Sequence, residues 1–135
     1  NTTEVNPKSS KPVIALMDEQ MHITDMGGTM RLGAQKCELS QDSKAFSAYG
    51  EKAITERHRH RYEFNDAYYE QYQTNGMIAS GVNPETKLVE AIELPAHPWF
   101  VGVQYHPEYS STVANPHPLF VGFVNACNRY AQSKK

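Results

Sequence analysis

Two ionisable side chains, those of His106 and Glu108, follow an uncharged run from Trp99 to Tyr105 that is rich in β-branched and aromatic residues. Such a run is typical of a buried strand. Pro107 ends it, because proline has no N–H to donate and fixes its own φ. In α/β proteins the carboxyl ends of strands open onto the ligand crevice. A histidine beside a carboxylate can act there as a general base, with the carboxylate fixing its tautomer. A turn without catalytic role is the alternative, and no nucleophile accompanies the pair.

A second stretch with chemical potential runs from Glu56 to Glu63. If it is a strand, alternation puts its arginines on one face and its histidines on the other: Arg57, Arg59 and Arg61, and His58 and His60. The arginines could form a solvated face or a patch that binds a nucleotide or nucleic acid. The His-x-His pair could bind zinc with His106, as in a metal-dependent hydrolase. The residues alone leave these alternatives open.

Glycines and polar residues near the N-terminus give weaker signals. The spacing of Gly27, Gly28 and Gly33 matches neither G-x-G-x-x-G nor the P-loop, so a phosphate cradle is not favoured. We expect these glycines to allow positive φ or close backbone approach, with Met30 and Leu32 packed on one face. The polar segment at 1–11 is typical of a tail without fixed structure.

The elements that must position these residues follow from periodicity and capping signals. Apolar or alternating runs predict strands over 13–17, 36–39, 77–80, 88–94 and 99–105, with the later ones pairing antiparallel. Caps predict one helix from Asp42 or Ser43 to Tyr49 and another over 66–74 after Asn65. A last helix opens around Pro118, and its apolar stripe should dock on the sheet, with Cys127 in the core.

Size and charge exclude some classes of protein. The chain has 135 residues, 13 basic and 15 acidic, with a net charge of −2, which fits one domain and argues against a dedicated nucleic-acid binder. Cys37 and Cys127 are too few for a disulfide framework and fit a reducing cytoplasm. No apolar run approaches a membrane span, and no signal peptide opens the chain. Because it begins at Asn1 rather than Met, we expect part of a longer protein.

Several motifs together indicate a family. The sequence Gln104-x-His106-Pro107-Glu108 resembles the end of class I (triad) glutamine amidotransferases, in which His and Glu complete a triad with a cysteine much earlier in the chain. Four further stretches are similar to the amidotransferase domain of CTP synthases: 26–33, 56–63, 97–100 and 117–120. The resemblance is ungapped in these motifs and runs over essentially the whole chain.

The resemblance implies an α/β fold, with a mixed sheet flanked by helices, and a role for four residues. Residues 1–135 would be the C-terminal portion of an amidotransferase domain, without the strand and helix of the nucleophile elbow. His106 would be the catalytic base and Glu108 would orient it. Glu4 would pair with the α-ammonium group of glutamine, and the planar guanidinium of Arg61 with its α-carboxylate.

The resemblance also implies what the longer enzyme does. It would be a cytoplasmic homotetramer that hydrolyses glutamine and passes ammonia to a separate synthetase domain, which converts UTP to CTP with ATP and Mg²⁺ and with GTP as activator. This part of it would hold no cofactor or metal. Neither Cys37 nor Cys127 matches the nucleophile motif, so the chain alone should be inactive. An exposed apolar face or an oligomer is expected as well.

Overall fold

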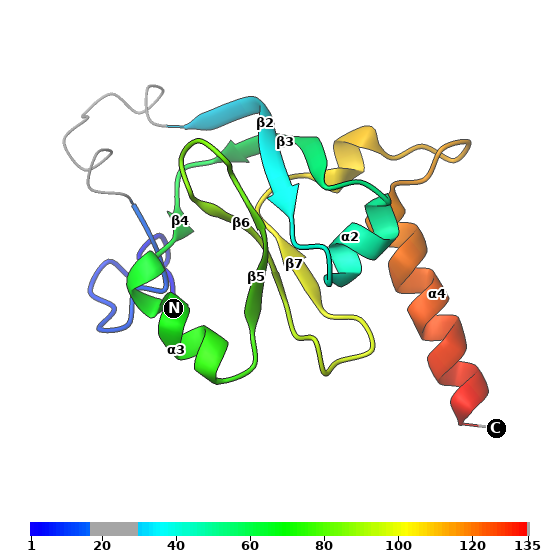
Figure 1. Cartoon of the computed structure of the whole chain (residues 1–135). Coiled ribbons are helices and arrows are strands. Elements are labelled where there is room, and N and C mark those ends of the chain that lie inside the picture. The colour runs from blue at the N-terminus through cyan, green and yellow to red at the C-terminus, as the bar shows by residue number, and fades with distance from the viewer. Residues whose placement is uncertain (17–29, 135) are drawn as a thin grey trace.

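The computed structural model describes residues 1–16 and 30–134 and consists of two sheets and a set of short and long helices (Figure 1). The larger sheet has five antiparallel strands in the order β3-β2-β5-β6-β7. They are β2 (Arg31–Leu39), β3 (Ala53–His60), β5 (Ile78–Val82), β6 (Val89–Glu93) and β7 (Val101–Val103). The smaller sheet pairs β1 (Ile14–Ala15) with β4 (Glu63–Phe64), and a parallel bridge joins Thr2 to Ile14. The expected end of the first strand at Met17 and the glycines Gly27 and Gly28 lie outside the described residues.

The helices begin and end where the capping residues predict. In α2 (Lys44–Tyr49), Ser43 Oγ accepts from Phe46 N–H at 2.9 Å and Gly50 closes the helix with φ of 75°. Asn65 caps a 3₁₀ turn, η1 (Asp66–Tyr68), that leads directly into α3 (Tyr69–Thr74). The last helix, α4 (Pro118–Ser133), has Pro118 in its first turn, and a second 3₁₀ turn is η2 (Pro107–Ser110). The α/β expectation is confirmed.

The core lies between the larger sheet, α2 and the first turn of α4 (Figure 1). Its buried residues come from β2, α2, β3, the segment after β7 and α4: Cys37, Leu39, Ala45, Ile54, Tyr105 and Leu119. A hydrogen-bond network lies beside this core. His117 Nε2 lies 2.8 Å from Glu56 Oε1, and Tyr49 Oη donates to the same oxygen at 2.8 Å. The start of α4 is therefore fixed to β3 and α2.

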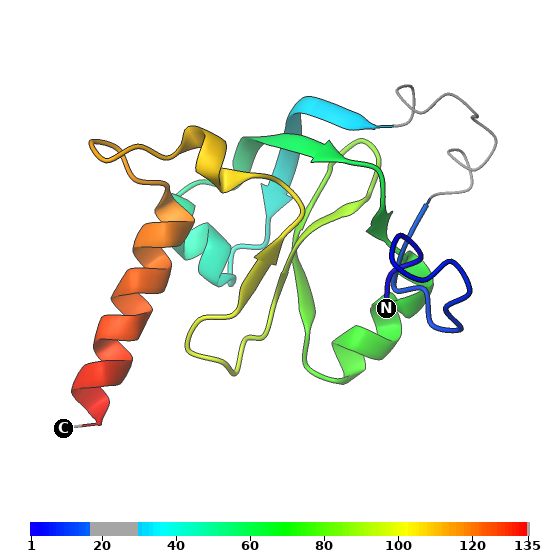
Figure 2. The ribbon, with the colours of Figure 1, turned by 180° about the vertical axis from the view of Figure 1, so that it is seen from behind.

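The larger sheet is curled, and the chain after β7 closes it. The backbone N–H of Gln104 donates to the carbonyl of Glu90 on β6 at 2.9 Å. Two residues later, the N–H of His106 donates to the carbonyl of Arg57 on β3, the strand at the opposite edge of the sheet, at 2.9 Å. From behind, this segment runs from β7 across to β3 (Figure 2). The strand predicted over Trp99 to Tyr105 is thus shorter at both ends. Trp99 and Phe100 precede it, and the chain after Gln104 crosses toward β3.

Two packing predictions are wrong. The apolar stripe of α4 does not dock on the sheet: Phe123 and Val124 are 52% and 54% exposed, and Cys127 is exposed too. The helix packs instead through Leu119, Ala126 and Gly122, where a Cβ atom would lie 2.2 Å from Cη2 of Trp99. Small residues allow this close approach, and the larger apolar side chains point elsewhere.

Leu32 is 55% exposed rather than packed beside Met30. It alternates along β2 with Arg31, whose side chain turns toward buried carboxylates, so Leu32 takes the outer face. In the described part of the chain, no helix is long and apolar enough to cross a bilayer.

Candidate active site

His106 and Glu108 form a hydrogen-bonded pair at the start of η2. His106 Nδ1 lies 2.7 Å from Glu108 Oε1, as the sequence predicts. Pro107 begins the 3₁₀ turn and brings the carboxylate back toward the ring. Because an ionised carboxylate can only accept, Nδ1 carries the proton and Nε2 is the basic nitrogen of the neutral ring. The hydrogen bond from His106 lowers the pKa of Glu108, so the carboxylate stays charged.

The aromatic ring of Tyr109 completes the surroundings of this pair. The rings of His106 and Tyr109 are 5.2 Å apart and inclined by 30°. On β3, the guanidinium carbon of Arg57 lies 5.7 Å from the centre of the Tyr109 ring. The carbonyl of Arg57 also accepts from the backbone N–H of His106, so His106 and Tyr109 each contact β3. The imidazole remains partly exposed, at 34% of its side chain.

Glu4 and Arg61 line one cavity of about 560 Å³. Its other lining residues are Ile14, Met30, Arg59, His60, Tyr62 and Gln104. This volume lies within the usual range for small-molecule sites. A carboxylate and a guanidinium at one hollow suit a ligand that carries both an ammonium group and a carboxylate. His106 and Glu108 are not among the lining residues, but Gln104 precedes His106 by two positions.

Backbone pairing explains why Glu4 reaches this cavity. The N-terminal segment is no loose tail, because Thr3 N–H donates to the Ile14 carbonyl at 3.0 Å and Ile14 N–H to the Asn1 carbonyl at 3.1 Å. Ile14 in turn pairs with Phe64 of β4. The segment that carries Glu4 is therefore placed beside the chain that follows Arg61.

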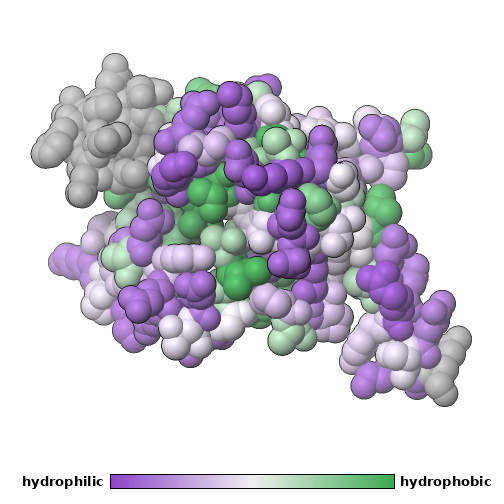
Figure 3. All heavy atoms as spheres, in the orientation of Figure 1, coloured by the Kyte–Doolittle hydropathy of each residue, from purple (hydrophilic) through white to green (hydrophobic). Residues whose placement is uncertain are grey.

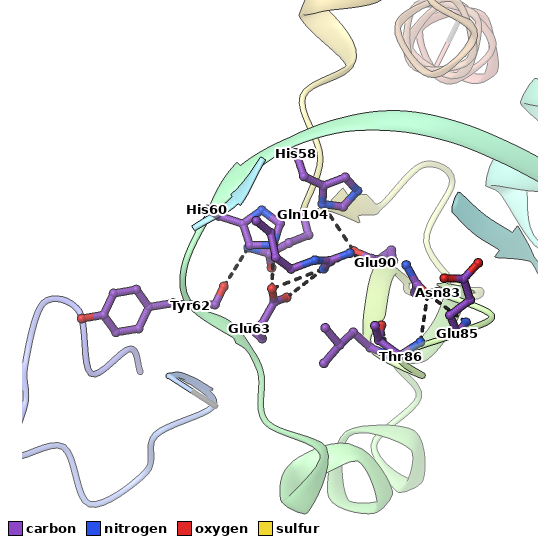
Figure 4. A network of polar contacts seen from close by, with 11 residues as sticks. His58, His60, Tyr62, Glu63, Asn83, Glu85, Thr86, Glu90 and Gln104 are labelled. Atoms are coloured by element: carbon purple, nitrogen blue, oxygen red, sulfur yellow. Dashed lines mark hydrogen bonds and ion pairs between the residues drawn. The ribbon is translucent and has the colours of Figure 1, made fainter. Parts of the chain in front are cut away.

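A buried ionic cluster adjoins the cavity through His60, which lines it (Figure 4). Arg31 from β2 reaches Glu90 of β6 at 2.7 Å and Glu63 of β4 at 3.3 Å. His60 Nε2 lies 2.9 Å from Glu63 Oε1. Burial raises the pKa of Glu90, and the Arg31 guanidinium opposes that shift. The cluster ties β2, β4 and β6 together at the end of β3.

The zinc interpretation has no support in this cluster. His58 is fully buried, and burial together with the nearby Arg31 lowers its pKa to about 3, so the ring is neutral. Its Nδ1 is 3.6 Å from Glu90 Oε2, while His60 is engaged with Glu63. Across residues 1–16 and 30–134, no three His, Cys, Asp or Glu side chains are grouped in a way that could hold a metal ion.

The alternation predicted for β3 is confirmed, but it stops before Arg61. Arg57 and Arg59 are exposed, whereas Glu56 and His58 are buried on the other face. Arg61 comes after the last residue of β3 and lies in the turn that leads to β4. The three arginines therefore do not form one strand face, and Arg61 has its own setting at the cavity.

Neither cysteine is placed to serve His106. Cys37 is fully buried on β2, where burial and then the nearby Glu90 raise its pKa to about 12, so it stays a thiol. Cys127 lies on α4, in a smaller pocket of about 270 Å³ with His97 and Trp99. A larger groove of about 640 Å³ runs between α2 and α4, and its described lining includes none of the four predicted site residues.

Sequence reasoning missed the contribution of Gln104 and of the buried carboxylates. Gln104 Nε2 donates to the carbonyl of Tyr62 at 3.1 Å, so it joins the two halves of the site. A glutamine at the end of an apolar run carries no charge that would mark it. Glu90 did give a signal, because an acidic residue in an otherwise apolar strand needs a buried partner.

Known proteins with similar sequences and folds were compared with this chain. The family model for glutamine amidotransferase class-I matches residues 7–126. A CTP synthase from Cytophaga hutchinsonii is 58% identical over 135 residues, which are 100% of this chain and 25% of that protein. One from Flavobacterium johnsoniae is 62% identical over 126 residues, or 93% of this chain and 24% of that protein. The chain thus spans about a quarter of the length of these relatives.

Solved structures agree with this match. The glutaminase domain of the Trypanosoma brucei CTPS, solved with bound acivicin, has a TM-score of 0.85 at 36% identity and covers 96% of this chain and 50% of its own. A GMP synthase protein from Thermoplasma acidophilum shares the fold, with a TM-score of 0.58 at 17% identity over 79% of this chain and 49% of its own. On the family match over most of its length, the chain belongs to the class-I glutamine amidotransferases.

Proposed function

We propose that residues 1–135 are the C-terminal portion of the glutamine amidotransferase domain of a CTP-forming enzyme. The relatives named CTP synthase are similar to this chain over all or nearly all of its length. The observation that carries the proposal is the cavity itself. Glu4 and Arg61, far apart in the sequence, line one hollow of suitable size, and the His106–Glu108 pair follows Gln104 of its lining.

In this proposal the cavity holds the amino-acid end of glutamine. The α-ammonium group pairs with the Glu4 carboxylate, and the α-carboxylate makes a two-point contact with the Arg61 guanidinium. These contacts leave the side-chain amide of glutamine as the end that reacts. The half-buried setting of Arg61 strengthens its attraction for a carboxylate compared with a fully solvated position.

His106 moves the protons of the reaction. Its Nε2 takes the proton of a thiol supplied by another part of the full-length enzyme, and the thiolate attacks the amide carbon. The imidazolium then gives that proton to the departing nitrogen, which leaves as ammonia, and a thioester remains. His106 next takes a proton from water as the water attacks the thioester. The C–S bond then breaks, glutamate is released, and the imidazolium returns its proton to the thiolate. Glu108 holds the ring and stabilises the imidazolium in both halves of the reaction.

The ammonia passes to a separate synthetase domain of the same enzyme. There it aminates UTP to CTP, with ATP and Mg²⁺ as cofactors and GTP as activator. In this proposal ATP, Mg²⁺ and GTP bind to the rest of the enzyme. The full-length enzyme works as a homotetramer in the cytoplasm.

A comparison of two nitrogen sources tests the proposal. In the full-length enzyme, His106→Ala should abolish CTP formation with glutamine but leave CTP formation with ammonia intact. The synthetase reaction needs only ammonia, and His106 serves only its release. The 135-residue chain by itself should release no ammonia from glutamine. Equal loss of both activities in a folded variant would show that His106 is structural or couples the domains.

A further inference from the structure

We propose that Gln104 and His60 are positioning residues for Arg61. Their side chains make hydrogen bonds that hold the turn formed by residues 60–63 at two points. The inference rests on the proposed function, because it takes Arg61 as the residue that holds the α-carboxylate of glutamine. Arg61 and Tyr62 occupy the middle of this 60–63 turn, between the last residue of β3 and the first of β4. A guanidinium on such a turn can make a two-point contact with a carboxylate only if the turn is held in place. Hydrogen bonds that hold the turn are called tethers.

The first tether joins the two ends of the turn. His60 Nε2–H donates to Glu63 Oε1 at 2.9 Å (Figure 4). Glu63 is itself held on several sides, because it is 1% exposed, lies in β4 opposite Ala15, and accepts from Arg31. The bond therefore links the side chains at the two ends of the turn, in addition to the pairing of His60 with Arg31 of β2.

The second tether holds the tip of the turn. Gln104 Nε2 donates to the carbonyl of Tyr62 at 3.1 Å (Figure 4). Gln104 is anchored through its own backbone N–H, which donates to the Glu90 carbonyl at 2.9 Å. Two residues later His106 bonds to β3. One short segment thus fixes both the peptide after Arg61 and the proposed catalytic base.

Both tethers line the cavity with Arg61, yet their chemistry suits an indirect role. One N–H of the Gln104 amide donates to the Tyr62 carbonyl, and the Nε2–H of His60 donates to Glu63. Loss of one such bond lets the turn move, and a bidentate contact is sensitive to shifts of about 1 Å. We expect each loss to raise the KM for glutamine by about threefold to tenfold, the usual effect of one hydrogen bond.

The test uses matched substitutions in the full-length enzyme. Gln104→Met removes the donor at similar volume, and Gln73→Met makes the same exchange at an exposed position of α3. His60→Leu removes the first tether, and His60→Gln restores a donor of similar reach. We expect Gln104→Met and His60→Leu to raise the KM for glutamine, with little change in ammonia-dependent turnover. Gln73→Met should match the wild type, and His60→Gln should recover part of the loss.

A double-mutant cycle separates positioning from general support of the fold. If Gln104 acts through Arg61, Gln104→Met should raise the KM much less when Arg61 is already lysine. The inference would be overturned if Gln104→Met raised the KM for glutamine by the same factor with arginine and with lysine at position 61. It would also be overturned if ammonia-dependent turnover fell as much as glutamine-dependent turnover. If Gln104→Met does not fold, as judged by thermal unfolding, the His60→Leu and His60→Gln pair carries the same test in the same two backgrounds.

The outcomes also distinguish this inference from the proposed function. If Arg61→Lys alone leaves the KM for glutamine unchanged, the proposed role of Arg61 fails and the inference fails with it. If Arg61→Lys raises the KM but Gln104→Met and His60→Leu do not, the proposed function stands and the positioning role is wrong.

Discussion

Two of the His–Glu pairs, His117–Glu56 and His106–Glu108, have opposite characters because of their hydrogen bonds. In His117, Nδ1 accepts from Leu119 N–H at 3.2 Å and caps α4, so Nε2–H donates to Glu56. Both nitrogens are used, and the ring is 3% exposed. In His106, Glu108 engages Nδ1, and the side chain is 34% exposed. The first pair is suited to stability, whereas the second leaves a basic nitrogen that a reacting group can reach.

Glu108→Gln tests the charge of the second pair in the full-length enzyme. A glutamine oxygen can still accept from Nδ1–H, so the tautomer is kept, but the negative charge that stabilises the imidazolium is lost. We expect kcat with glutamine to fall by about 10²-fold, with ammonia-dependent turnover unchanged. Glu85→Gln, at an exposed ion pair with Lys36, serves as the control. An unchanged kcat in Glu108→Gln would remove Glu108 from the reaction.

His58 should make the protein sensitive to acid. Its native pKa of about 3 lies below the ordinary value of 6.5, so the unfolded chain binds more protons between these two values. Stability from this group is complete above pH 6.5 and is lost as the pH falls toward 3. Between pH 7 and pH 5 we expect a loss of about 2 kcal/mol in the free energy of unfolding.

Urea unfolding of the wild type and of His58→Leu at both pH values measures this loss. The variant has no imidazole to protonate, so its stability should change by about 2 kcal/mol less over the same interval. His97→Leu, at an exposed histidine, should keep the full acid sensitivity. The same pH dependence in all three proteins would contradict the assignment of a neutral, buried His58.

The sequence pattern alone predicted part of the candidate site. His106 and Glu108 follow from an apolar run that proline stops, and the 2.7 Å bond between them is confirmed. Glu4 and Arg61 could be named only by resemblance, because the backbone pairing that brings their segments together is long-range. Gln104 was missed for a similar reason, since its partner is the carbonyl of Tyr62 and leaves no mark in the local pattern.

Strand β2 supports the rest of the fold through its first residue, Arg31, which neutralises carboxylates on two other strands. Arg31 contacts Glu63 of β4 and Glu90 of β6, which belong to different sheets. Both carboxylates are 1% exposed. Removing the cation would leave buried charge without its guanidinium, which is far more costly than losing a pair on the surface.

Arg31→Met should therefore lower the free energy of unfolding by about 3–5 kcal/mol. Lys36→Met makes a similar exchange on the same strand, where the ion pair with Glu85 is exposed, and should cost at most about 1 kcal/mol. Chemical denaturation at neutral pH measures both. Similar small losses in the two variants would mean that the buried cluster is not a structural support.

The position of Gly122 predicts whether a Gly122→Ala substitution stabilises or destabilises the protein. In a helix, Gly→Ala ordinarily adds about 1 kcal/mol of stability. Here the new Cβ would lie 2.2 Å from the Trp99 ring, so α4 or Trp99 must move. We expect Gly122→Ala to lower stability by about 1–3 kcal/mol, and Trp99→Leu in addition to relieve part of that loss. A stabilised Gly122→Ala protein would show that α4 does not pack against Trp99 as described.

Helix caps were predicted well because they depend on residues close together in the sequence. The packing of helices was predicted less well because it depends on residues far apart in the sequence. Ser43, Asn65 and Pro118 mark helix starts through contacts within a few residues. The stripe of α4 indicated an amphipathic helix, but periodicity does not say which neighbour covers which face. Trp99 selects the side that carries Gly122, and this choice was invisible in the sequence.

Across the whole molecule, one crossing segment links fold and site. Residues 104–106 join β6 to β3 across the open side of the curled sheet, and they carry one cavity residue and the proposed base. Hydrophobic residues gather in the middle of one face, surrounded by hydrophilic ones (Figure 3). Other apolar side chains are exposed on α4, among them Phe123 and Val124. The expected exposed apolar surface is thus present.

The hairpin of β5 and β6 could be predicted, since it joins two neighbouring apolar runs through the turn at Asn83. The closure of the sheet could not, because the backbone bond from His106 to Arg57 joins segments that are far apart in the sequence. That bond spans the sheet, and periodicity within a strand carries no information about it.

The central claim is that the cavity with Glu4 and Arg61 binds the amino-acid end of glutamine, and Arg61→Lys in the full-length enzyme tests it most directly. Lysine keeps the charge but loses the planar two-point contact. We predict a weaker binding of glutamine by about 1.5–3 kcal/mol, seen as a higher KM, with ammonia-dependent CTP formation unchanged because ammonia has no carboxylate. An unchanged KM for glutamine in a folded Arg61→Lys enzyme would contradict the account.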